Sequence, residues 1–81
     1  MVLEINLNTF EKAIQIVNIC EPYAAYFDID VVCGRYTVDA ISILGVESLV
    51  GNKVRIVIHG VKNPDEIDKV KQLEDSLKAI G

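Results

Sequence analysis

The 81-residue chain is predicted to fold as a single α+β domain, in which three helices cover one face of a four-stranded antiparallel sheet. Two observations predict this class. Segments with alternating apolar and polar residues are interspersed with segments of helical apolar spacing, in the order β-α-β-β-α-β-α. Each predicted strand also has one apolar and one polar side, which favours a sheet covered on one face and open to water on the other. The same pattern is equally compatible with a ferredoxin-like sheet.

The first two elements are a strand and a capped helix. Residues 2–7 alternate between apolar and polar side chains, which predicts a half-buried strand. The next element, a helix, is expected to have Asn8 as its N-cap, with Glu11 completing a capping box, and to end at Pro22. Its predicted apolar stripe consists of Phe10, Ala13, Ile14, Val17 and Cys20.

The middle of the chain predicts a hairpin and a short helix. Residues 27–33 alternate most regularly, Gly34 supplies the turn, and residues 35–40 form a short third strand. A helix of about two turns is expected over residues 42–49, with the Ser42 hydroxyl bonded to a backbone N–H at its start.

The last two elements are a strand and a long helix. Residues 53–60 predict the fourth strand, with Val54, Ile56 and Ile58 on one side. In the final helix Asn63 is the expected cap, and Glu66 completes the capping box. The apolar stripe of this helix is predicted to consist of Ile67, Val70, Leu73, Leu77 and Ile80.

Composition excludes several classes of function. Hydrophobic residues make up 51% of the chain, enough for an efficient small core. The net charge is −4 and no basic cluster is present, so a nucleic-acid partner is not expected. Apolar runs are short and the N-terminus has no signal-peptide pattern, so no membrane insertion and a cytoplasmic location are expected. Cys20 and Cys33 are far apart in sequence and are expected to be reduced thiols.

The run from Gly34 to Leu49, with Ser42-Ile43-Leu44-Gly45-Val46 at its helix start, closely resembles the middle of HPr, the small phosphocarrier of the bacterial sugar phosphotransferase system. The resemblance covers nearly the whole chain. It implies an HPr-like open-faced β-sandwich of residues 1–81, with strand order 1-4-2-3. It also implies phosphotransferase-system or regulatory proteins as partners.

The family's phosphate site is altered in this chain. In the resembling family, a histidine just before the first helix carries the phosphoryl group, with an arginine two residues later and a proline after that. The corresponding positions here hold Asn8, Phe10 and Glu11. An amide nitrogen is not nucleophilic, and a carboxylate disfavours a bound phosphate. The resemblance therefore predicts the fold without phosphate transfer on histidine, with no catalytic residue, metal ligand or cofactor.

Two other residues remain alternative phosphoacceptors. His59 is the one histidine of the chain and lies at the end of the fourth predicted strand, beside Asp28 and Asp30 of its neighbour. We interpret it mainly as a solvated strand residue in a surface pair. Ser42 matches a serine that a dedicated kinase phosphorylates in some members of the family, although Ile41 stands where a basic residue is frequent there.

The short helix carries more apolar residues than it can bury on one side. The predicted partner-binding residues are Phe10, Ile43, Leu44, Val46 and Val50. Simple packing of Ile43, Val46 and Leu49 under the sheet is the alternative interpretation. Taken together, the sequence predicts a non-catalytic binding module, monomeric or weakly homodimeric. An active phosphocarrier that uses His59 or Ser42 is the competing hypothesis.

Overall fold

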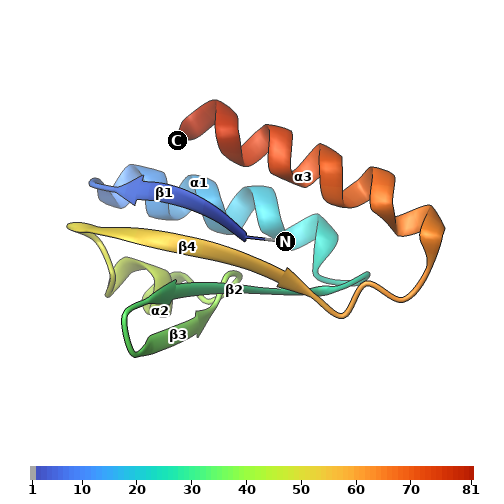
Figure 1. Ribbon diagram of the computed structural model, residues 1–81. Helices are drawn as coiled ribbons and strands as arrows, with labels where there is room; N and C mark the ends of the chain where they lie inside the picture. Colours follow the sequence, from blue (N-terminus) through green and yellow to red (C-terminus); the bar gives the residue numbers. More distant parts are fainter. Residues whose placement is uncertain (1) are drawn as a thin grey trace.

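A computed structural model, which describes residues 2–81, has a four-stranded antiparallel sheet in the order β1-β4-β2-β3 (Figure 1). The strands are β1 (Val2–Leu7), β2 (Asp28–Cys33), β3 (Tyr36–Asp39) and β4 (Asn52–His59). The α+β class and the strand order expected from the resemblance are both confirmed.

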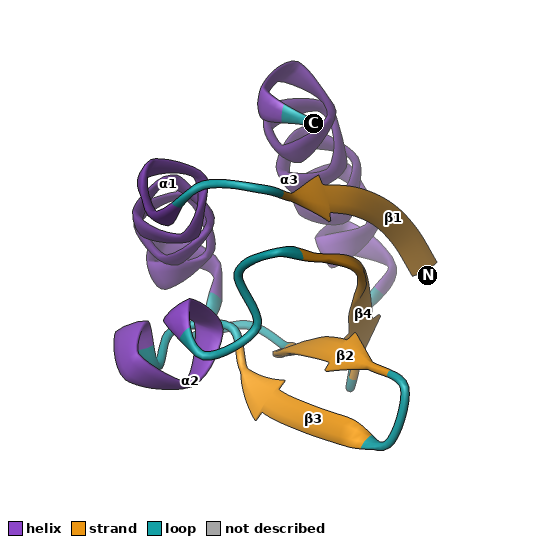
Figure 2. Cartoon of the chain, turned by 90° about the vertical axis from the view of Figure 1, so that its left-hand side faces the viewer, coloured by secondary structure: helices purple, strands orange, loops and turns teal. Residues whose placement is uncertain are grey.

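Three α-helices lie on one side of the sheet, as the end-on view in Figure 2 shows. They are α1 (Phe10–Cys20), α2 (Ile43–Glu47) and α3 (Ile67–Ile80). Short 3₁₀ turns follow α1 at Glu21–Tyr23 and precede α3 at Pro64–Glu66. The arrangement leaves the polar sides of the strands uncovered, as the alternating sequence pattern requires.

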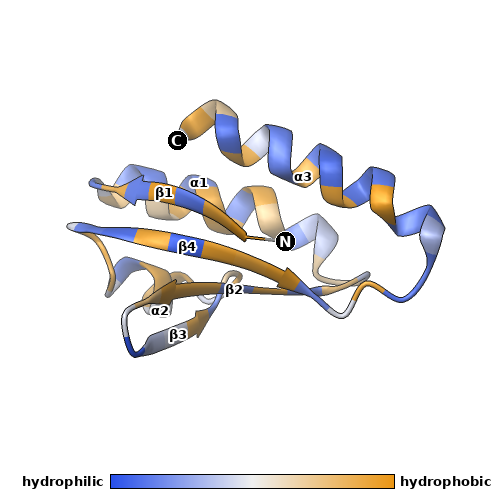
Figure 3. Ribbon diagram, viewed as in Figure 1, coloured by the Kyte–Doolittle hydropathy of each residue, from blue (hydrophilic) through white to orange (hydrophobic). Residues whose placement is uncertain are grey.

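The core lies between the sheet and the helices. Side chains at alternate strand positions point into it, among them Ile5, Val31 and Ile56, and each is at most 2% exposed. Leu73 and Leu77 of α3 are fully buried against them. Figure 3 shows the same division along α3, where apolar and polar residues alternate with the helical turns.

Two glycines fit positions where a side chain would be unfavourable. Gly34 has a φ of +57° in the hairpin turn between β2 and β3, a backbone conformation that glycine adopts without steric cost. Gly45 lies inside α2, and a Cβ added there would be 3.1 Å from the Cβ of Val38. The small residue therefore lets α2 approach β3 closely.

The helix ends differ from the sequence prediction in two places and agree in a third. The N-cap of α1 is Thr9 rather than Asn8, and the Ser42 side chain makes no capping hydrogen bond to α2. At the 3₁₀ turn that precedes α3, the carboxylate of Glu66 accepts hydrogen bonds from the N–H groups of Asn63 and Lys62, at 3.0 and 3.1 Å. The predicted role of Glu66 in a capping box is therefore confirmed.

The buried faces of two helices also differ from the predicted stripes. Ile16 replaces Ile14 in the buried face of α1, and both Ile14 and Phe10 are exposed. In α3 the predicted stripe begins too early, because Ile67 is 61% exposed. Helical spacing alone is compatible with Phe10, Ile14 and Ile67 in the core. The orientation of each helix on the sheet instead leaves these side chains exposed.

Candidate functional site

The start of α1 corresponds to the place where the HPr family, which this chain resembles, carries its phosphate. Thr9 has an extended backbone, and its hydroxyl accepts a hydrogen bond from the Lys12 N–H at 3.1 Å. The Thr9 carbonyl accepts from the Ala13 N–H at 3.3 Å, and the Lys12 ammonium donates to the carbonyl of Asn6 at 3.1 Å. Asn8 therefore precedes the N-cap, and the predicted Asn8–Glu11 capping box is wrong.

The electrostatics of this helix start disfavour a second anion. Glu11 is exposed in the first turn of α1, where the positive end of the helix dipole stabilises its carboxylate. A phosphoryl group at this place would add close to two negative charges beside that carboxylate. The one cation of the first turn, Lys12, is bonded to a backbone carbonyl.

His59 lies at the opposite end of the sheet. Strand β4 begins at Asn52, which pairs with Leu7 just before α1, and it ends at His59, which pairs with Asp28. Eight strand residues separate the two ends by about 23 Å. His59 therefore does not replace the missing histidine at the start of α1.

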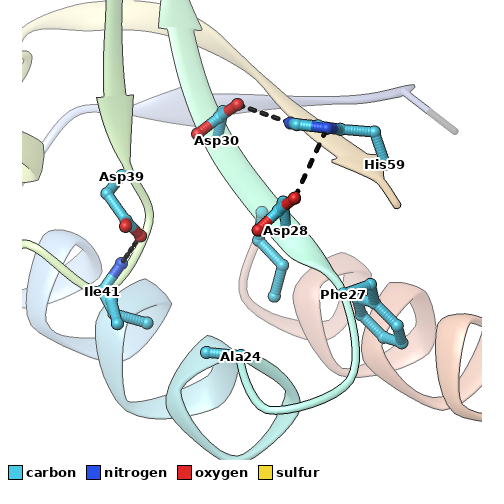
Figure 4. A pocket seen from close by; sticks show the side chains of 8 residues that line it. Ala24, Phe27, Asp28, Asp30, Asp39, Ile41 and His59 are labelled. Atoms are coloured by element: carbon cyan, nitrogen blue, oxygen red, sulfur yellow. Dashed lines mark hydrogen bonds and ion pairs between the residues drawn. The ribbon is translucent and has the colours of Figure 1, made fainter. Parts of the chain in front are cut away.

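Two carboxylates flank the imidazole of His59 (Figure 4). Its Nε2 atom is 2.7 Å from Oδ2 of Asp30, and its Nδ1 atom is 4.0 Å from Oδ2 of Asp28. Asp39 pairs with Asp30 across β3 and β2, and its carboxylate accepts a hydrogen bond from the Ile41 N–H at 3.1 Å. The cross-strand Asp–His pairing expected from the sequence is confirmed.

These residues border a pocket of about 180 Å³ at one end of the sheet, between the segment before β2 and the segment after β3. Three carboxylates line it, together with apolar side chains of Ala24, Phe27, Ile29 and Ile41. A phosphate on either nitrogen of His59 would be repelled by the carboxylates of Asp28 and Asp30, since like charges a few ångströms apart disfavour each other. The pocket is therefore unsuited to a phosphoryl group.

Ser42 occupies the N-cap position of α2 without using its side chain. Its carbonyl accepts from the Val46 N–H at 2.9 Å, but the predicted hydroxyl cap is absent among the described residues. The side chain is exposed at the start of the five-residue helix. The hydroxyl is thus accessible, and its phosphorylation stays a prediction.

A group of exposed apolar side chains lies on two helices that contact each other, α1 and α2. Leu44 is 79% exposed and Phe10 60%, and their helices also expose Ile14 and Ile43. We call these four residues the α1–α2 surface. The Gly51 N–H donates to the carbonyl of Leu7 at 2.7 Å, which holds the segment after α2 against the start of α1.

Two residues predicted for partner binding lie elsewhere. Val46 is fully buried in the core, and Val50 is half-buried and packs against it. Val46 is inaccessible and Val50 only partly exposed, so the exposed members of the predicted set are Phe10, Ile43 and Leu44. Ile14 was missed because helical spacing placed it in the core stripe; its position four residues after Phe10, on the same helix face, was the available signal.

Membrane-spanning helices and metal clusters are both absent from the part of the chain that the structure describes. No helix within residues 2–81 is long and apolar enough to cross a membrane. Over the same range, no three side chains of His, Cys, Asp or Glu are arranged to hold a metal ion.

Comparison with known proteins finds a similarity to a solved structure. No protein-family model and no curated protein matches the chain. Among solved structures, it is similar to a crystal structure of HPr-C-His from Thermoanaerobacter tengcongensis, with a TM-score of 0.61 and 22% sequence identity over 96% of each chain. The likeness extends over the whole domain and establishes the HPr-like fold.

Proposed function

We propose that this chain is a non-catalytic, HPr-like protein-binding module. It contacts proteins of the phosphoenolpyruvate-dependent sugar phosphotransferase system, or their regulators, through the α1–α2 surface. It accepts no phosphate on histidine. The observation that carries the proposal is the start of α1, where a threonine cap and an exposed carboxylate occupy the helix end at which the resembling family holds its phosphate.

The chemistry of that helix end supports a structural role. Thr9 bonds two backbone N–H groups of the first turn through its hydroxyl and carbonyl oxygens. Asn8 offers an amide that is not nucleophilic, and Glu11 adds negative charge. The same segment can therefore cap and stabilise α1 but has no group suited to carry phosphate.

Exposed apolar area supports a binding role. Side chains as large as Phe10 and Leu44 remain mostly in water, although the domain buries many other apolar residues. An apolar group on two adjacent elements marks an interaction surface more often than isolated exposed residues do. An aromatic side chain such as Phe10 can contribute strongly to an interface because it buries a large apolar area.

The competing function is a working phosphocarrier with His59 or Ser42 as its acceptor. The carboxylates of Asp28 and Asp30 next to both ring nitrogens of His59 argue against it. Ser42 is accessible, but a serine phosphate is far more stable than a histidine phosphate and suits regulation rather than transfer.

Incubation with enzyme I and labelled phosphoenolpyruvate tests the proposal. We expect no acid-labile label on the chain, while a genuine HPr in the same reaction becomes labelled. A His59→Ala variant serves as the matched control. Label on the wild-type chain that disappears in this variant would identify His59 as an acceptor and overturn the proposal.

A further inference from the structure

The charged side chains around the α1–α2 surface are mainly acidic, which restricts the kind of partner that can bind there. Helices α1 and α2 together carry two acidic side chains, Glu11 and Glu47, and one basic side chain, Lys12. The ammonium of Lys12 donates to the Asn6 carbonyl and is therefore held toward the end of β1. Within residues 2–81, neither glutamate forms an ion pair. Glu11 is exposed and Glu47 is half-buried, so each can meet an opposite charge on a partner.

Both glutamates border the exposed apolar residues. Glu11 lies three residues before Ile14, so these two side chains are neighbours on the surface of α1. Glu47 lies three residues after Leu44, on the same side of α2. The exposed apolar side chains thus have an acidic border on each helix.

We infer that the partner of the α1–α2 surface presents an apolar contact bordered by lysine or arginine side chains. This inference rests on the proposed function and adds to it the sign of the charges that the partner carries. Opposite charges at the border of an interface accelerate association and exclude partners with the wrong sign. A partner with an acidic border would meet like charges from both helices and bind more weakly.

Two synthetic amphipathic peptides serve as probes. They share one leucine face and differ only in whether their polar positions carry lysine or glutamate. Binding is followed by the backbone amide shifts of the isotope-labelled protein, at low and at high salt. We expect the lysine peptide to shift residues around Phe10 and Leu44, with affinity that falls as salt rises, and the glutamate peptide to bind weakly or not at all.

Two double variants distinguish the effect of charges at the α1–α2 surface from the effect of the net charge of the protein. Glu11→Gln with Glu47→Gln removes two charges at the α1–α2 surface, and Asp68→Asn with Asp75→Asn removes two exposed charges on α3. We expect the first pair to weaken the lysine peptide about fivefold and the second to leave it nearly unchanged. An equal effect of both pairs would mean that only the net charge of −4 matters, and would overturn the inference.

The remaining outcomes distinguish this inference from the proposed function. If the glutamate peptide shifts the amide signals of Phe10 and Leu44 as strongly as the lysine peptide does, the docking surface is supported but the inferred basic character of the partner is wrong. If the lysine peptide instead shifts Asp28, Asp30 and Asp39, the acidic sheet face is the basic-peptide site and the inference is also wrong. If neither peptide shifts Phe10 or Leu44, the binding surface itself is refuted.

Discussion

Replacing Thr9 by alanine removes the side-chain cap of α1 and should lower the stability of the whole domain. The lost contact is the 3.1 Å hydrogen bond from the Lys12 N–H to the Thr9 hydroxyl. Because this end of the helix is exposed, water replaces part of the interaction, and the expected cost is about 1 kcal/mol. For a domain of this size such a loss corresponds to a midpoint temperature about 4–8 °C lower.

Urea denaturation of three variants tests this assignment of the cap. Thr9→Ala should lose about 1 kcal/mol, whereas Thr9→Ser keeps a hydroxyl and should lose much less. Asn8→Ala is the matched control, because its side chain lies before the cap, and it should change stability by less than about 0.5 kcal/mol. If Asn8→Ala costs as much as Thr9→Ala, Asn8 is the cap after all and our account of the helix start is wrong.

The other stability predictions concern two apolar residues of α2 and one buried thiol. Val46→Ala should cost about 2 kcal/mol, since it leaves a cavity in the core, whereas Leu44→Ala should cost less than about 0.5 kcal/mol because Leu44 is 79% exposed. Equal costs in denaturation would contradict the division between core and partner surface. Burial, and secondarily the charge of Asp39, raises the pKa of Cys20 to about 12 from 9.0. As the pH rises, the unfolded chain loses the thiol proton near pH 9, whereas the folded protein keeps it until about pH 12. The free energy of unfolding should therefore fall by about 1.4 kcal/mol per pH unit between these two pH values, and this thiol should have no effect below them. A Cys20→Ala variant should lack this slope, and an identical slope in both proteins would refute the raised pKa.

The succession of four strands and three α-helices along the chain could be predicted from the sequence pattern, whereas the order of the strands within the sheet could not. Alternation in residues 28–33 and 52–59 places apolar side chains on one face whichever strand lies beside them. The order β1-β4-β2-β3 depends on pairings between distant segments, which spacing does not determine. It came from the resemblance, whereas spacing alone left a ferredoxin-like sheet equally open.

The pairing of His59 with Asp30 becomes predictable once the strand order is known. Given that β4 and β2 are antiparallel neighbours, alternation places these side chains on the same uncovered face. The 2.7 Å contact then needs only the register of the two strands. The cap of α1 is harder to predict, because Asn8 and Thr9 are both good N-cap residues and adjacent. The hydrogen bond that Asn8 donates through its backbone to the Asn6 carbonyl keeps it outside the helix.

Helix α1 also explains why the candidate surface was only partly predicted. It carries more apolar residues than one face can hold, so two overlapping stripes satisfied helical spacing, one with Ile14 and one with Ile16. Packing against the sheet selects Ile16 and leaves Ile14 exposed with Phe10. A helix that served the core alone would gain nothing from apolar side chains at these two positions, since they remain in water. Their presence beside the exposed residues of α2 is the physical reason why we propose a partner that covers this side of the fold.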